Sequence, residues 1–133
     1  MILSRAASAV EARANRHIET FGFCASDFGI LECLLHKEAL PVSAIGRKIL
    51  LTSGSITSAI DRLEKKGLVA RAFSPDDRRT RIVDLTAQGR KLIESAFAEH
   101  ETEIESAVAV LNDSERRTLI ELLKKLGHHA ATL

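Results

Sequence analysis

Residues 50–69 read LLTSGSITSAIDRLEKKGLV and constrain the fold more than any other stretch. Apolar residues recur at helical spacing and predict an amphipathic helix whose buried stripe is Ile56, Ala59, Ile60 and Leu63. Gly67 marks its C-terminal end. The first turns of the opposite face carry serine, threonine and glycine, which are mediocre helix formers. Such a face suits close approach to a flat polar surface, such as the floor of a DNA groove.

A β-hairpin is predicted directly after this helix. The segments LVARAF and TRIVDL are rich in β-branched and apolar residues, and they flank the polar loop SPDDRR with Pro75 in a turn position. The tip of this hairpin carries Arg78 and Arg79. Leu40-Pro41, further upstream, is predicted to be a turn.

Helices surround these two features. Apolar periodicity and capping residues predict a helix over 2–20, a largely apolar helix capped by Ser26, a short helix over 42–49, a long helix over 87–110 and a last helix ending at Gly127. The order predicts a mainly α fold with a small β-hairpin wing, that is, a winged helix-turn-helix lobe over 26–85. We expect one domain over 1–133, in which the helices over 1–20 and 87–127 form a dimerisation region. Their apolar faces need a partner, and a second copy of the chain with two-fold symmetry is the simplest one.

The charge of the chain is unevenly distributed. Residues 47–81 hold nine basic and four acidic residues, a net charge of +5, whereas residues 1–46 sum to −1 and residues 82–133 to −3. This asymmetry favours a localised contact with a polyanion, although a solvated charged face explains it about as well.

The sequence argues against several other classes of protein. No phosphate-binding glycine loop or nucleophile elbow is present, and no histidine pairs with a cysteine or carboxylate at a zinc spacing. We therefore expect no enzyme, no metal and no cofactor. The absence of tyrosine and tryptophan removes the usual stacking platform for single-stranded nucleic acid. No apolar run is long enough for a membrane span and no signal peptide is visible, so we expect no membrane association and a cytoplasmic location.

These motifs resemble the MarR family of bacterial transcription regulators. The resemblance covers nearly the whole chain and includes the run LLTSGSITSAIDRLEKKGLVAR and the wing SPDDRRTRIVDLTAQG. The run IGRKILLTSGSIT resembles the corresponding sequence in one branch of the family, whose members respond to quinones or other oxidative electrophiles.

The resemblance implies roles for particular residues. The recognition helix would enter the major groove, with contacts to phosphates and base edges from Ser53, Ser55, Thr57, Ser58 and Arg62. Arg62 is the long donor there that is able to contact guanine with two hydrogen bonds. The wing residues Arg78, Arg79 and Arg81 would contact DNA, with Arg78 or Arg79 in the adjacent minor groove.

Other charged residues near these contacts have two interpretations. Asp76 or Asp77 would pair with a wing arginine and fix its direction, and the spacing does not distinguish the two pairings. Lys65 and Lys66 are either phosphate contacts or ordinary cations at a helix end. Arg71 forms a salt bridge or touches DNA.

The two cysteines are interpreted differently. Cys24 lies between the first two predicted helices, near the cleft where inducers commonly act in this family, so a sensing role by oxidation or alkylation is one interpretation. A small buried hydrophobe is the other. Cys33 lies on the apolar second helix and is expected in the core.

The sequence therefore predicts a transcriptional regulator, a ligand- or redox-responsive repressor that binds a pseudo-palindromic operator as a homodimer. Its partners would be double-stranded DNA, a second copy of the chain and a small-molecule or electrophile inducer. The alternative is a winged-helix protein–protein interaction module that does not bind DNA specifically.

Overall fold

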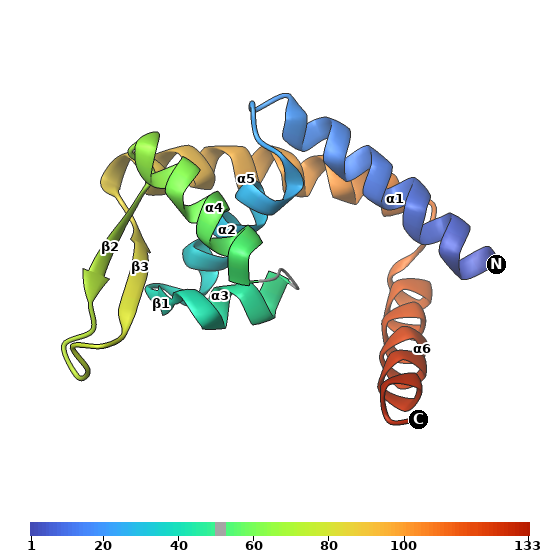
Figure 1. The fold of residues 1–133 in the computed structure, drawn as a ribbon. Coiled ribbons are helices and arrows are strands. Elements are labelled where there is room, and N and C mark those ends of the chain that lie inside the picture. Colours follow the sequence, from blue (N-terminus) through green and yellow to red (C-terminus); the bar gives the residue numbers. More distant parts are fainter. Residues whose placement is uncertain (50–52) are drawn as a thin grey trace.

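The computed structural model describes residues 1–49 and 53–133, and within these ranges the chain forms helices and a small sheet (Figure 1). In chain order the elements are α1 (Ile2–Glu19), α2 (Ala25–Lys37), β1 (Leu40–Pro41), α3 (Val42–Ile49), α4 (Ser53–Lys65), β2 (Val69–Phe73), β3 (Arg81–Leu85), α5 (Ala87–Val108) and α6 (Asp113–Ala131). The predicted class, mainly helical with a small β wing, is confirmed.

The hydrophobic core lies around α2. One face of this helix is fully buried through Phe28, Ile30, Leu31 and Leu34. The α4 helix packs its apolar stripe into the same core, and the predicted stripe is confirmed because each of its residues is at most 2% exposed: Ile56, Ala59, Ile60 and Leu63. Val69 and Val83 extend this core to the sheet, so the wing is anchored on the helices.

The sheet has one strand that the sequence did not predict. The hairpin of β2 and β3 is confirmed, but Leu40-Pro41, predicted as a turn, forms the edge strand β1. Leu40 pairs with Val83 and Pro41 with Ile82 in an antiparallel register. Proline is tolerated on an edge strand, and a two-residue strand is too short to leave an alternation in the sequence.

Hydrogen bonds and a close backbone contact join three segments: the end of α4, the base of the wing and the start of α5. Gly67 ends α4 with a φ of 74°, as predicted. The hydroxyl of Thr86 donates to the carbonyl of Gly67 over 2.6 Å and accepts from the amide of Gly89 over 3.0 Å. A Cβ at Gly89 would lie 1.9 Å from the carbonyl oxygen of Leu68, so only glycine fits there.

The remaining helices extend away from this lobe. In Figure 1, α1 lies along α5, and Arg13 forms an ion pair with Glu103 across this contact (N···O 2.8 Å). The last helix, α6, begins with a capping box of Asn112 and Glu115 and continues to Ala131. The predicted end at Gly127 was wrong, because an interior glycine costs a helix only about 1 kcal/mol.

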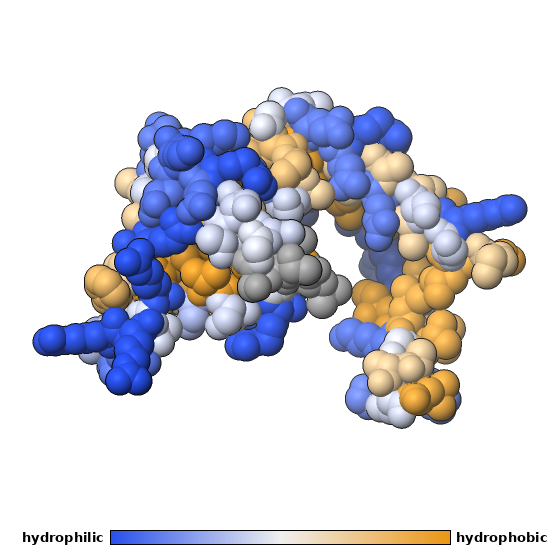
Figure 2. Space-filling model, in the orientation of Figure 1, coloured by the Kyte–Doolittle hydropathy of each residue, from blue (hydrophilic) through white to orange (hydrophobic). Residues whose placement is uncertain are grey.

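No residue of α6 is buried. Apolar side chains gather over α6 and the N-terminal end of α1 in the space-filling view (Figure 2). Those on α6 are Leu119, Ile120, Leu122, Leu123 and Leu126, each at least 40% exposed. A row of leucines so open to water is typical of a surface that another chain covers.

Candidate nucleic-acid interface

The exposed face of α4 carries small residues, as the sequence predicted. Ser55, Thr57 and Ser58 are exposed, whereas the intervening Ile56 is buried. Ser53 is the first residue of the helix. Gly54 is exposed, with nothing within 4 Å of the position that a Cβ would take. No bulky side chain therefore projects from these residues, so a flat polar surface can approach the α4 backbone closely.

The wing presents its arginines to solvent. Arg78 and Arg79 lie in the loop between β2 and β3 and are exposed, and Arg81 is exposed at the start of β3. Figure 2 shows the wing as a strongly hydrophilic projection on the side of the lobe away from α6. The guanidinium of Arg81 lies over the ring of Phe73, 5.1 Å from its centroid. Phe73 is itself 61% exposed, so this pair is a surface feature of the wing.

The carboxylate of Asp77 binds donors within the wing loop. Asp77 accepts hydrogen bonds from the backbone amide of Arg79 (2.9 Å) and the hydroxyl of Thr80 (3.0 Å). These two bonds lower the pKa of Asp77, the amide of Arg79 contributing most. Among the described residues no ion pair joins Asp76 or Asp77 to a wing arginine. Asp77 therefore shapes the turn that carries Arg79, without contacting its guanidinium.

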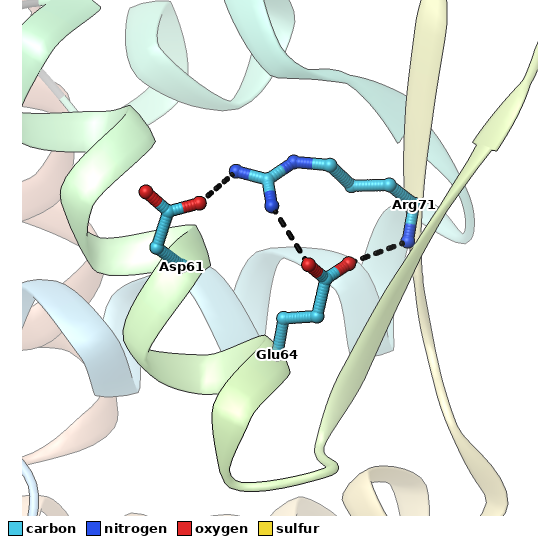
Figure 3. A network of polar contacts seen from close by, with 3 residues as sticks. All are labelled: Asp61, Glu64 and Arg71. Carbon is cyan, nitrogen blue, oxygen red and sulfur yellow. Dashed lines mark hydrogen bonds and ion pairs between the residues drawn. The ribbon is translucent and has the colours of Figure 1, made fainter.

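Arg71 joins the wing to the recognition helix. It extends from β2 and donates to Asp61 (Nη2···O 2.7 Å) and to Glu64 (Nη1···O 3.0 Å), both on α4 (Figure 3). Its own backbone amide also donates to Glu64 over 3.2 Å. Of the two interpretations of Arg71, the salt bridge is present in this structure. The network connects the two elements that would contact DNA.

Arg62 forms an ion pair with a buried carboxylate of the same chain. Its Nη2 donates to Oδ1 of Asp27 over 2.7 Å and its Nε donates to Oδ2 over 3.3 Å, so the guanidinium binds the carboxylate in a bidentate manner. Asp27 is only 3% exposed, and the pair raises the pKa of Arg62. The sequence analysis had not identified Asp27 as the partner of Arg62.

The energetics of this pair change the expected role of Arg62. Because Asp27 is buried, separation of the pair would leave a carboxylate in the core without its cation, whereas the side chain of Arg62 is 49% exposed. The Asp27 pair is therefore expected to persist when α4 meets DNA. Asp27 takes two of the five guanidinium N–H groups, and the thiol of Cys24 is a further neighbour of Arg62.

Lys66 also has a contact within the chain, because its Nζ lies 5.0 Å from the centroid of the Phe23 ring. This cation–π contact is a third interpretation, which the sequence analysis had not considered. Lys65 is exposed at the last residue of α4.

Neither cysteine is fully buried, in contrast to the interpretation that placed them in the core. Cys24 is exposed and is the N-cap residue of α2, a position predicted for Ser26. Its Sγ lies 3.2 Å from the hydroxyl of Ser26, and the thiol is also near enough to Arg62 to help raise the pKa of that guanidinium. Cys33 is half-buried, and desolvation raises the pKa of its thiol.

Residues 1–49 and 53–133 contain no group of three or more metal-ligating side chains placed to hold an ion. No helix in the same ranges has the length and apolar character needed to cross a membrane.

Comparison with known proteins agrees with this geometry. A model of the MarR family matches residues 25–80. The HTH-type transcriptional regulator MhqR of Bacillus subtilis is 40% identical over 130 residues, which cover 98% of this chain and 90% of that protein. The regulator YkoM of the same organism, whose function is uncharacterised, is 33% identical and is covered to 86%.

Solved structures share the fold. A probable transcriptional regulator from Pseudomonas aeruginosa superposes with a TM-score of 0.81 at 30% identity, covering 94% of this chain and 93% of that one. BpsR of Bordetella bronchiseptica, whose DNA binding is regulated by 6-hydroxynicotinic acid, superposes with a TM-score of 0.82 at 28% identity, covering 95% and 90%. A mutant MarR from E. coli in complex with operator DNA has a TM-score of 0.83 at 23% identity, covering 94% and 90%.

Proposed function

Because this chain belongs to the MarR family of transcriptional regulators, we propose that it controls transcription by binding double-stranded DNA through α4 and the wing. The observation that carries the proposal is the exposed row of small residues on α4, beside a wing with three exposed arginines. A face without bulk admits the groove, and a basic hairpin adds phosphate attraction that does not depend on sequence.

The two elements have different tasks. The N-terminal half of α4 would lie in the major groove, with hydroxyl contacts from Ser53, Ser55, Thr57 and Ser58. Hydroxyl groups donate to phosphates and to any base edge, so they allow close approach with modest discrimination. The wing would insert Arg78 or Arg79 into the neighbouring minor groove, with Arg81 on the adjacent phosphates.

The functional unit is a homodimer in which 26–85 is the DNA-binding lobe and the helices over 1–20 and 87–127 form the dimerisation region. The exposed leucines of α6 supply an apolar surface for a second copy. Two-fold symmetry would then place two α4 helices about one helical turn of DNA apart, roughly 34 Å, on a pseudo-palindromic operator.

The output is repression that a small molecule or an oxidant relieves. A ligand that prefers a different spacing of the two lobes would shift the dimer away from the DNA-bound conformation. The regulation of BpsR by 6-hydroxynicotinic acid favours a small-molecule inducer here too. Cys24, exposed at the corner between α1 and α2, is the residue where an electrophile would react.

As a regulator of bacterial promoters the protein would act in the cytoplasm, and it would act by binding rather than by catalysis. MhqR and YkoM are both described as transcriptional regulators.

The experiment that tests this function is binding to a labelled duplex from the region upstream of its own gene. Excess nonspecific competitor and about 150 mM salt keep nonspecific attraction low. We expect nanomolar binding with one dimer per site. If neither this duplex nor random-sequence selection yields a site while the dimer is intact, the protein is an interaction module and the proposal is wrong.

A further inference from the structure

The ion pair between Asp27 and Arg62 joins two helices with different positions in the proposed complex. Arg62 lies on α4, which would face the DNA, whereas Asp27 lies in the first turn of α2, inside the lobe. The side chain of Asp27 is 5% exposed and that of Arg62 is 49% exposed. The pair therefore reaches from the core to the surface.

Both carboxylate oxygens of Asp27 are occupied by Arg62. Nη2 donates to Oδ1 over 2.7 Å and Nε donates to Oδ2 over 3.3 Å. This arrangement uses one long edge of the guanidinium and leaves the edge formed by Nη1 and the second Nη2 hydrogen for another acceptor. The plane of the guanidinium is thus set by a residue that does not belong to the recognition helix.

Separating the pair would leave a carboxylate in the core without its cation. Among the described residues, Arg62 is the partner of both Asp27 oxygens, and leaving a buried carboxylate unpaired is destabilising. Arg62 consequently has little freedom to leave Asp27 when DNA approaches.

We propose that Asp27 is a positioning residue for operator recognition, which keeps Arg62 paired in the DNA-bound state and directs its free edge to a phosphate. This inference rests on the proposed function. Arg62 then contributes hydrogen bonds in a fixed direction without a net positive charge, since the pair is neutral. Its contact with the backbone fixes the register of α4 in the groove, as phosphate contacts do.

Salt dependence of operator binding separates this arrangement from its alternatives. Asp27→Asn keeps the size of the side chain but leaves Arg62 as an additional free cation. We expect the slope of log affinity against log salt to steepen by about one unit, and the preference for operator over nonspecific duplex to fall at least about tenfold. Glu94→Gln, which removes the same charge from the exposed face of α5, outside the wing and the recognition helix, is the matched control and should leave both values unchanged.

The double variant Asp27→Asn, Arg62→Gln tests the pairing itself. It restores neutrality, so its salt slope should return to the wild-type value. If Arg62 instead leaves Asp27 to meet DNA with its full charge, Asp27→Asn will leave the slope unchanged, and this result would overturn the inference. A slope and preference for Asp27→Asn equal to those of Glu94→Gln would overturn it as well.

A measurement on the wild-type dimer does not depend on the folding of any variant. The Nε–H resonance of Arg62 should keep its chemical shift and slow solvent exchange when operator is added, and loss of this signal into fast exchange would contradict the inference. Wild-type protein that binds no duplex at all would overturn the proposed function, and this inference with it. If the wild type binds operator but Asp27→Asn does not steepen the salt slope, the inference alone is overturned and the proposed function stands.

Discussion

The Nδ1 atoms of His17 and His100 lie 3.0 Å apart, where α1 crosses α5. At that separation one imidazole donates and the other accepts, so at least one of them is neutral. His100 is 9% exposed and its ring also lies 5.0 Å from that of Phe28, a residue of the lobe core. The pair thus contacts both the helices proposed for dimerisation and the DNA-binding lobe.

This contact predicts that acid destabilises the protein. Burial, followed by the charge of His17, lowers the pKa of His100, and these effects exceed the opposing influence of Glu32 and Glu103. The unfolded chain therefore takes up the proton first as the pH falls below about 6.5. We expect the free energy of unfolding to be highest above that pH and to decrease down to the lower pKa of folded His100, where this contribution levels off.

Urea denaturation of the dimer at about pH 7.5 and pH 5.5 measures the effect. His100→Gln should reduce the loss of stability between these two values, whereas His128→Gln, at the exposed end of α6, should not. Equal losses in the wild type and the His100 variant would remove this pair as the origin of the acid sensitivity.

How much of the site could be predicted depends on whether the signal was local. The α4 stripe, the wing and Gly67 follow from spacings within a few residues, and all are present. The partner of Arg62 lies 35 residues away, and no local pattern joins the two. One signal was available: Asp27 shares a helical face with Ile30, Leu31 and Leu34, so a carboxylate on a buried face needed a cation from elsewhere.

Arg71 illustrates a second limit. Its strand position allowed either a salt bridge or a DNA contact, and the choice depends on how β2 returns beside α4. The close approach of Gly89 to Leu68 is likewise a contact between segments that periodicity does not relate. The two-residue strand β1 was not predicted for the same reason, since its pairs with β3 join residues 41 and 43 positions apart (Pro41 with Ile82, Leu40 with Val83).

Substitution of a wing arginine should weaken DNA binding through charge alone. Arg78→Ala or Arg79→Ala is expected to reduce the salt slope of operator binding by about one unit, with the dimer intact. Each variant removes one cation that would contact a phosphate or the minor groove. Titration of labelled operator at several salt concentrations measures this slope. Arg117→Ala on α6 is the control with the same charge change. An unchanged slope for both wing variants would show that the wing lies outside the interface.

Bulk on the exposed face of α4 should block the groove. Ser58→Leu adds a large side chain at an exposed position, so we expect operator affinity to fall about 100-fold or more, while stability changes by about 0.5 kcal/mol or less. Ser58→Ala adds no bulk and should stay within about tenfold of the wild type. Binding assays paired with thermal melts compare the two variants. Retained affinity in Ser58→Leu would mean that another face reads the DNA.

The Arg71 network predicts that geometry, apart from charge, matters for binding. Arg71→Lys keeps the positive charge, but an ammonium group is a point charge that cannot hold Asp61 and Glu64 with a planar fork. The wing then loses its fixed position relative to α4. We expect operator affinity to fall several-fold with an unchanged salt slope and unchanged nonspecific binding. Arg117→Lys is the matched control, and equal operator affinities of the two variants would show that the network is dispensable.

Arg116 holds the elbow between α5 and α6. It donates to the carbonyl of Val108 (3.2 Å), the last residue of α5, and to that of Leu111 (3.0 Å) in the connection to α6, and it forms an ion pair with Glu105 on α5. Because no residue of α6 is buried, the direction in which α6 leaves α5 depends on these contacts (Figure 1). Arg116 thereby presents the apolar row of α6 to a partner in a fixed orientation.

Arg116→Ala should accordingly weaken the dimer while the lobe stays folded. Hydrogen bonds that involve a charged group contribute about 1.5–3 kcal/mol, so the loss of even one corresponds to at least about a tenfold increase in the dimer dissociation constant. Analytical ultracentrifugation across a dilution series measures that constant, and Arg117→Ala, one residue further along α6, is the control. Identical constants for the two variants would mean that the partner chain, and not the elbow, sets the orientation of α6.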